Sequence, residues 1–242
     1  MVPSLNILHY KRLQSTNTTA YRLGVRSAPE WTVVVADVQT KGRGRGRKKW
    51  ESPKGGLWFS ILLRPNVPSA KLPLLQFLAA IATRKALENE TGLSVKLKWP
   101  NDLVLGSAKL GGILIESKTL GDSVSFAILG IGVNINQSKS QLPPGAVSLR
   151  LVSRKQHDLR TLMRAILDQI RSSSDDLDNA SRIMEEWWHN CIHRPLRVQV
   201  TLPKGAVSGI SKGIDEDGAL LIETDGGRIR KVSEGSLRLL YD

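Results

Sequence analysis

Apolar residues follow one another along the first part of the chain at spacings that predict alternating strands and helices. Residues 31–38 are apolar and rich in β-branched side chains, and residues 57–63 are almost wholly apolar, so both predict buried strands. Residues 70–91 carry apolar side chains at helical spacing and predict a helix that Gly92 caps. We expect 137–153 to be a loop. The other segments with strand or helix patterns are 15–26, 95–99, 104–105, 109–117, 125–136, 158–172 and 180–191.

From Pro195 the pattern changes to short β-rich segments at close intervals, separated by turn signals rich in glycine and aspartate. The predicted strands are 196–202, 206–214, 219–223, 228–232 and 237–240. Five strands within fewer than fifty residues predict a small barrel. We therefore divide the chain into a larger domain over residues 1–194 and a small β domain over residues 195–242.

The composition is that of an ordinary soluble globular protein, with 242 residues, 40% of them hydrophobic and 24% charged. No apolar run approaches the roughly 20 residues of a membrane-spanning helix. No secretion signal is visible, so we expect a cytoplasmic protein without a membrane partner. The single cysteine, Cys191, excludes an internal disulfide framework. The net charge of +13 suits nucleic acid, an acidic protein or a polyphosphate, but basic residues extend from Lys11 to Arg238 and mark no single partner.

Residues 41–49 form the most unusual segment, because each of them is either a glycine or a cation. Glycine lets the backbone approach a ligand closely, and the lysines and arginines supply charge and N–H donors. The segment cannot pack a core and repels itself, so we expect it to be mobile until an anion such as one or two phosphates orders it. It matches neither a Walker A loop nor a dinucleotide-binding fingerprint. A solvated basic loop or a nucleic-acid tether fits the same composition.

Three further groups of residues have both a functional and a structural interpretation. Asn101 and Asp102 follow a predicted strand, where ligand-binding loops often begin, although both are also common turn formers. Lys109 enters an apolar strand whose glycines would let a ligand lie flat on the sheet, although a lysine there can simply extend to solvent. His189 and His193 could share a helix face, but a metal site is disfavoured because no further cysteine or histidine completes it.

Taken together, the order and spacing of these motifs resemble the biotin protein ligases. The resemblance extends over essentially the whole chain and includes a C-terminal segment similar to the SH3-like barrel of that family. The matching motifs are Ser15-Thr16-Asn17, Gln39-x-x-Gly42-Arg43-Gly44-Arg45, Trp50, Lys98-Trp99-Pro100-Asn101-Asp102, Lys109-x-Gly-Gly112 and Gly132-x-Asn134. The resemblance implies an α+β fold, with a mixed-sheet catalytic domain of the class II synthetase or biotin–lipoate ligase type followed by the small barrel.

The resemblance also implies a reaction. Enzymes of this family make biotinyl-5′-adenylate from biotin and ATP with magnesium, and then transfer biotin to a lysine of a biotin carboxyl carrier protein. In the first step the biotin carboxylate attacks the α-phosphate, so cations placed where the two anions meet lower the barrier. Lys109 and Arg45 match the catalytic positions. Magnesium is expected to be held mainly through ATP, and no protein ligand is assigned to it.

The binding residues are likewise implied by the resemblance. The positions that match biotin contacts are Ser15, Thr16, Asn17, Gln39, Gly42, Arg43, Gly44, Arg45, Lys109 and Gly112. The positions that match nucleotide contacts are Arg45, Trp50, Asn101, Asp102, Lys109 and Asn134. Hydroxyl and amide groups in the biotin set offer the donors and acceptors that a ureido ring needs. Closure of residues 41–49 over the adenylate would protect it from hydrolysis.

Two features depart from the family pattern. Many members carry Gly-Arg-Gly-Arg-x-Gly-Arg before the tryptophan, whereas this chain has Gly46-Arg47-Lys48-Lys49, so we assign no phosphate to Arg47 or Lys48. No winged-helix segment precedes Ser15, so we expect a ligase that does not bind DNA. We also expect a homodimer through an exposed strand of the catalytic sheet.

The sequence leaves two alternative functions open. One is a lipoate ligase or octanoyltransferase of the same fold. The other, from a different class, is a nucleic-acid-binding protein that binds through residues 41–49.

Overall fold

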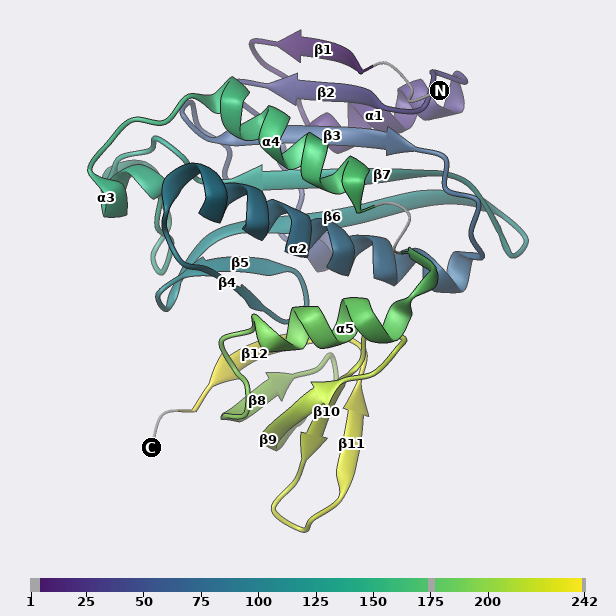
Figure 1. The fold of residues 1–242 in the computed structure, drawn as a ribbon, viewed down its shortest axis with the longest axis vertical. Coiled ribbons are helices and arrows are strands. Elements are labelled where there is room, and N and C mark those ends of the chain that lie inside the picture. Colours follow the sequence, from purple (N-terminus) through teal and green to yellow (C-terminus); the bar gives the residue numbers. More distant parts are fainter. Residues whose placement is uncertain (1–4, 174–176, 241–242) are drawn as a thin grey trace.

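The computed structural model describes residues 5–173 and 177–240, and the strands within them form two sheets (Figure 1). In this part of the chain the larger sheet has seven strands in the order β1-β2-β3-β7-β6-β5-β4. The pair β1–β2 is parallel and the other neighbours are antiparallel, so the sheet is mixed. Its strands are β1 (Asn6–Tyr10), β2 (Thr32–Ala36), β3 (Leu57–Leu63), β4 (Val95–Lys98), β5 (Asp102–Leu105), β6 (Ala108–Leu120) and β7 (Ser123–Val133).

The smaller sheet is antiparallel and is formed by the last part of the chain, seen below the larger sheet in Figure 1. Its order among the described residues is β11-β10-β9-β8-β12. The strands are β8 (Arg197–Thr201), β9 (Ala206–Ile214), β10 (Leu220–Glu223), β11 (Ile229–Val232) and β12 (Ser236–Leu239). The change of sheet at Arg197 supports the proposed division of the chain into residues 1–194 and 195–242.

Helices cover both faces of the larger sheet (Figure 1). On one face, α1 (Thr16–Val25) places Ala20 in a small apolar cluster with side chains of β2, β3 and β7. On the opposite face, α2 (Leu72–Thr91) and α4 (Leu159–Ser172) bury their leucines and isoleucines in the main core. The helix α5 (Ala180–His189) lies between α2 and the smaller sheet. No helix in the described segments is long and apolar enough to cross a membrane.

Local sequence signals explain where two of these helices begin and end. The Ser15 side chain accepts a hydrogen bond from the Thr18 backbone N–H and caps the start of α1, as its sequence predicts. α2 ends at Gly92, whose φ of 70° is the left-handed conformation that favours glycine, and whose N–H donates to the Glu88 carbonyl. The predicted helix at 70–91 is thereby confirmed.

Two parts of the fold differ from expectation. Residues 137–153 were predicted to be a loop, but they contain the 3₁₀ turn η3 (Lys139–Gln141) and the helix α3 (Leu149–Ser153). α3 has only five residues, too few to give a helical period, and is held by the buried Ser148, which accepts from the Leu151 N–H. The other difference is β1, a largely exposed edge strand whose pattern gave no strand signal.

The two sheets are joined by buried contacts. The Trp99 indole N–H donates to the Gly218 carbonyl over 3.0 Å, and its backbone N–H donates to Nε2 of His193 over 3.2 Å. In addition, α5 contacts β9 of the smaller sheet and is tied to α2 by a partly exposed ion pair of 2.7 Å between Glu186 and Lys85. The smaller sheet is therefore held in a fixed place beside β4, where the sequence predicts nucleotide-binding residues.

Candidate active site

A cavity of about 830 Å³ lies on the α1 face of the larger sheet, below the glycine–arginine loop and beside the smaller sheet. Gly112 of β6 and Gly130 and Gly132 of β7 line it. A Cβ at Gly130 would collide with the Asn17 amide, and a Cβ at Gly132 would lie 2.9 Å from Nε1 of Trp50. The glycines therefore leave the sheet bare, so that these side chains and a ligand can lie flat on it.

One end of the cavity consists of neutral donors and acceptors at the start of α1. Thr16 donates its backbone N–H to Oε1 of Gln39 over 2.8 Å, and its hydroxyl lies 3.1 Å from the same oxygen. The Gln39 amide in turn donates to Oγ of Ser52 over 2.8 Å. Ser15 and Asn17 line the same end. The orientation of the Gln39 amide is thus set by both of its neighbours.

Behind this end lies a carboxylate that sequence reasoning missed. Glu116 of β6 pairs with Nη2 of Arg43 over 2.8 Å and accepts from the Asn17 amide over 2.8 Å. The other end of that amide, Oδ1, accepts from the buried hydroxyl of Ser60 over 2.6 Å. Strand alternation was the available signal, because Gly112 and Glu116 are four residues apart and point to the same face. The pair leaves this end of the cavity without net charge.

The other end of the cavity is cationic. Lys109 pairs with Asp102 over 2.6 Å and lies 5.1 Å above the ring of Trp50, while the guanidinium of Arg45 lies 5.7 Å from the ring of Trp99. Burial lowers the pKa of Arg45, against the opposing effect of Glu234 and Asp102. Nη1 of Arg45 is buried and has no hydrogen-bond partner in the described part of the chain. An unpaired, buried cationic donor in a cavity favours an anionic ligand.

The glycine–arginine loop takes a defined conformation over the cavity. The Gly42 carbonyl accepts from the Trp50 N–H over 2.9 Å, and the Gly44 N–H donates to the Lys48 carbonyl over 2.7 Å, with a 3₁₀ turn η1 (Arg45–Arg47) between them. A Cβ at Gly42 would collide with the Trp50 carbonyl, so the fold requires glycine there. Nζ of Lys48 donates to Oγ of Ser236 in β12 over 2.9 Å. The loop is therefore attached to both sheets.

Most of the predicted site residues line this single cavity. They are Ser15, Thr16, Asn17, Gln39, Arg43, Gly44, Arg45, Trp50, Asn101, Asp102, Lys109 and Gly112. Two do not: Gly42 is buried where the loop closes, and Asn134 is buried beneath β6, where its amide donates to the Lys109 carbonyl over 3.5 Å. Both support lining residues, and their direct contact with a ligand stays a prediction.

The smaller sheet supplies part of the lining that the sequence did not predict. Thr201 of β8, Glu234 of the segment before β12 and Ser236 of β12 reach the cavity. They lie more than sixty residues after the last predicted site residue, Asn134, and no local motif marks them. Only the packing of the two sheets brings them to the site.

The histidine and cysteine residues of α5 and the segment after it lie outside the cavity. His193 is fully buried, and burial, with a smaller effect of Lys98, lowers its pKa to about 4. Burial likewise raises the pKa of the Cys191 thiol to about 12. His189 is exposed and its Nδ1 lies 2.8 Å from the Glu185 carbonyl. Residues 5–173 and 177–240 contain no group of His, Cys, Asp or Glu side chains that could hold a metal ion by itself.

Such a cavity suits two anionic ligands that meet at its cationic end, one of which carries an uncharged polar head. Residues 10–134 match the Biotin/lipoate A/B protein ligase family, and residues 197–237 match the Biotin protein ligase C terminal domain. The chain belongs to the Biotin/lipoate A/B protein ligase family. The match to the second domain accords with the small C-terminal β domain that the sequence predicts.

Individual relatives are similar over nearly the whole chain. The Bacillus subtilis bifunctional ligase/repressor BirA is 34% identical over 241 residues, 97% of this chain and 74% of that protein. The biotin–[acetyl-CoA-carboxylase] ligase of Paracoccus denitrificans is 30% identical over 227 residues, 90% of this chain and 94% of that protein. The structure of the Aquifex aeolicus biotin protein ligase in complex with biotin and ATP superposes with a TM-score of 0.82 at 31% identity, covering 97% of this chain and 99% of that one.

Proposed function

We propose that this chain is a biotin protein ligase, which activates biotin with ATP and transfers it to a lysine of a biotin carboxyl carrier protein. The observation that carries this function is the cavity with one neutral and one cationic end on a glycine floor. Biotin has the same division, with an uncharged ureido ring at one end and a carboxylate at the other. The family membership and the names of the relatives agree with this function.

The division of the cavity orients biotin. Its ureido ring lies at the neutral end, where Thr16, Gln39 and Asn17 present donors and acceptors. Its apolar chain runs along the glycine floor at Gly112, and its carboxylate reaches Lys109. The nucleotide then occupies the remaining cationic part, next to Arg45 and Trp50.

In the first step, a carboxylate oxygen of biotin attacks the α-phosphorus of ATP. The bond from that phosphorus to the oxygen bridging the β-phosphate breaks, and pyrophosphate leaves with the electron pair. Lys109 and Arg45 act as fixed cations that stabilise the charge on the transferring phosphate. Asp102, 2.6 Å from Lys109, holds its ammonium group in place.

Magnesium fits this site when it is held mainly by phosphates. Two carboxylates, Asp102 and Glu234, line the cavity, and Mg²⁺ commonly takes one or two protein carboxylates together with substrate phosphates and water. We propose Asp102 as the residue that would contact it. The bound ion would neutralise the departing pyrophosphate.

In the second step, the amine of a carrier lysine attacks the carbonyl of the adenylate. The carbon–oxygen bond to AMP breaks, AMP leaves with the electron pair and the nitrogen loses a proton, giving an amide. The net charge of +13 supports an acidic carrier domain as the partner. The homodimer, the cytoplasmic location and the absence of DNA binding stay predictions.

Lipoate or octanoate is the alternative substrate within the same family. Neither molecule has a ureido ring, and neither would use the donors and acceptors of Thr16 and Gln39. A site built for a polar head discriminates strongly against ligands that lack it, because its own polar groups are then left unpaired. The neutral end therefore favours biotin.

Titration calorimetry and a pyrophosphate assay test the function directly. Biotin is titrated first into the protein alone, and then into the protein with ATP and Mg²⁺. We expect biotin to bind in both cases and pyrophosphate to be released only when all three ligands are present. A protein that binds no biotin would contradict the function, and lipoate and then single-stranded nucleic acid would be the next ligands to test.

A further inference from the structure

Glu116 is the one carboxylate in contact with both the α1 segment and the glycine–arginine loop among the described residues. It does not line the cavity itself. Its side chain is 23% exposed, less than half the 51% of its partner Arg43. The carboxylate therefore acts on a ligand only through the two residues that it holds.

The first of these residues is Asn17, whose amide orientation is fixed by Glu116. The carboxylate accepts from Nδ2 over 2.8 Å. If the amide were turned round, Oδ1 would face the carboxylate, and two acceptors would meet without a proton between them. Ser60, fully buried, donates to Oδ1 over 2.6 Å and fixes the same orientation from the other side. The second N–H of the amide has no protein partner in the described part of the chain, and Asn17 lines the cavity. This leaves one donor for a ligand.

The second residue is Arg43, whose charge Glu116 offsets. Their atoms are 2.8 Å apart, and hydrogen bonds between charged groups are roughly twice as strong as those between neutral groups. With the pair in place, Arg43 presents its remaining N–H donors without adding net charge to that end. Without the carboxylate, the same end would carry an unbalanced cation and would attract anionic groups instead of neutral ones.

We propose that Glu116 is a positioning residue that gives this site its selectivity for an uncharged polar head group, the cyclic urea of biotin. This inference rests on the proposed function, since it names how the same cavity chooses its substrate. Glu116 sets the Asn17 donor and neutralises Arg43, so the head group meets a fixed pattern of donors. Lys109 and Arg45, at the cationic end, do not depend on it.

The test compares Glu116→Gln with the wild-type enzyme in the pyrophosphate-release assay. We expect the KM for biotin to rise about tenfold or more, because the variant loses the charge balance and an oriented acceptor. The KM for ATP should change less than about twofold, because no nucleotide-side residue contacts Glu116. The adenylation rate with biotin should fall relative to the rate with octanoate, because only biotin has a polar head group that the neutral end recognises.

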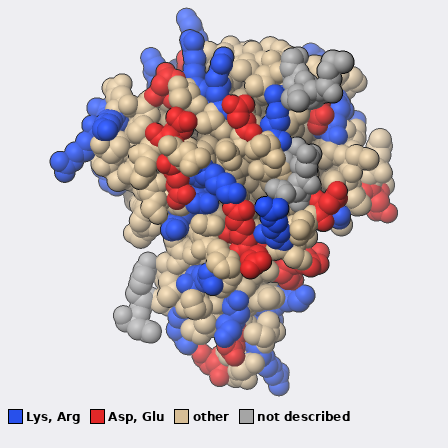
Figure 2. Space-filling model, viewed as in Figure 1, with Lys and Arg blue, Asp and Glu red and all other residues tan. Residues whose placement is uncertain are grey.

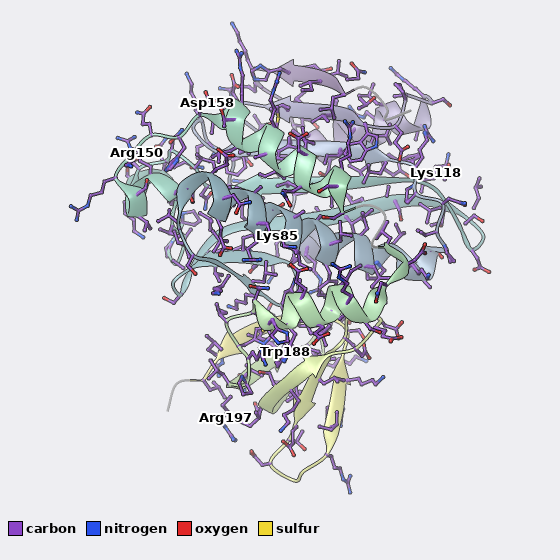
Figure 3. The ribbon with its side chains drawn as sticks, viewed as in Figure 1. Lys85, Lys118, Arg150, Asp158, Trp188 and Arg197 are labelled. Atoms are coloured by element: carbon purple, nitrogen blue, oxygen red, sulfur yellow. The ribbon has the colours of Figure 1, made fainter. Side chains whose placement is uncertain are left out.

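Two further variants keep the test decisive if Glu116→Gln folds poorly. Ser60→Ala removes the other anchor of Asn17, together with a 2.7 Å contact to the Thr16 hydroxyl, without touching Arg43, and should raise the KM for biotin by a smaller factor. Glu116→Asp keeps the charge but is one methylene shorter, so it should fall between wild type and Glu116→Gln. Glu186→Gln is the matched control, because it breaks an ion pair of 2.7 Å with Lys85 on the opposite face (Figure 3). Thermal unfolding of each variant separates folding from recognition.

The outcomes distinguish the inference from the function that it refines. A wild-type enzyme that releases no pyrophosphate with biotin would overturn the function itself. An active wild-type enzyme together with folded Glu116 and Ser60 variants whose KM for biotin is unchanged would overturn the inference alone. Equal rises in the KM for biotin and for ATP would also overturn it, since they would indicate a general structural role. If no variant adenylates octanoate, the KM values for biotin and for ATP alone decide whether the inference holds.

Discussion

At one end of the cavity Thr16, Gln39 and Asn17 form a neutral set of hydrogen-bonding groups, whereas at the other Lys109 and Arg45 form a cationic one. At the neutral end, protein groups hold the Gln39 and Asn17 amides in one orientation. The cationic end keeps an unpaired buried nitrogen on Arg45 in the described structure. The first end is therefore organised before a ligand arrives, whereas the second is completed by the ligand.

The two ends also depend on different parts of the fold. The neutral end is built from α1, β3, the loop before Gly42 and Glu116, all within the larger domain. The cationic end also needs the smaller sheet, which contributes Glu234 and holds Trp99 beneath Arg45. Figure 2 shows that basic and acidic residues are interspersed on the opposite face, which carries α2, α4 and α5.

The largest effect is expected at the cationic end. Lys109→Ala should lower the rate of pyrophosphate release about 10²–10³-fold, because it removes a fixed cation from the transferring phosphate. Biotin binding, measured by calorimetry, should be weakened far less. Lys118→Ala, on the exposed far end of the same strand, is the control and should leave the rate unchanged (Figure 3). Equal rates for the Lys109 variant and wild type would remove Lys109 from the chemistry.

The junction beneath the cationic end should respond to pH. Burial lowers the pKa of His193 from 6.5 to about 4. The unfolded chain therefore binds a proton that the folded chain does not, and stability falls as the pH drops from about 6.5 to about 4. Between these two pKa values, each pH unit lowers the free energy of unfolding by about 1.36 kcal/mol. The total loss should therefore be about 3 kcal/mol, with little further loss below pH 4.

Chemical denaturation at a series of pH values measures this loss. His193→Asn should flatten the dependence between pH 6.5 and 4, while the exposed His189→Asn serves as the control. A pH dependence that is the same in all three proteins would show that another group is responsible.

The glycine floor beneath the neutral end should be sensitive to a single methyl group. Gly130→Ala places a Cβ against the Asn17 amide. Displacing that amide should cost about 1–3 kcal/mol, a weakening of biotin binding of about five- to a hundredfold. In β9 of the smaller sheet, Gly213→Ala meets nothing closer than 3.8 Å and is the control. If biotin binds both variants equally well, the floor does not position Asn17.

The smallest effect is expected for Gln39, which holds Thr16 in place at the neutral end. Gln39→Ala removes one neutral acceptor from Thr16. One hydrogen bond contributes about 0.5–1.5 kcal/mol, so the KM for biotin should rise about two- to tenfold. The KM for ATP should not follow it. Gln199→Ala in β8, which loses a similar hydrogen bond to Ser208 over 3.1 Å, is the control. A larger effect on ATP than on biotin would reverse our orientation of the substrate.

Much of the fold followed from local patterns. Strands and helices were predicted within a few residues of their observed limits, because apolar spacing and caps such as Ser15 and Gly92 act over one or two turns. The exceptions were α3 and β1. α3 has five residues, too few for a period, and β1 is an exposed edge strand that needs no apolar face.

Some of the residues around the cavity were predictable from the sequence, and others were not. Motifs that combine glycine with charge, such as residues 41–49 and Lys109 with its glycines, were visible because those residue types are rare together in a core. Glu116 was not, since a single acidic residue in a strand is ordinary. Its importance arises from Arg43 and Asn17, which are separated from it by 73 and 99 residues in the chain.

The sequence by itself determined the strands and helices, the bare glycine floor and the cations that an anionic ligand needs. It also supplied, through the resemblance of its motifs, the biotin ligase reaction. Only the tertiary structure decided which of these groups are paired. It placed Glu116 against Arg43 and Asp102 against Lys109, and it brought Glu234 from the smaller sheet to the same cavity. The physical reason is that charge balance depends on distance in space, which strand pairing and sheet packing set and sequence spacing does not.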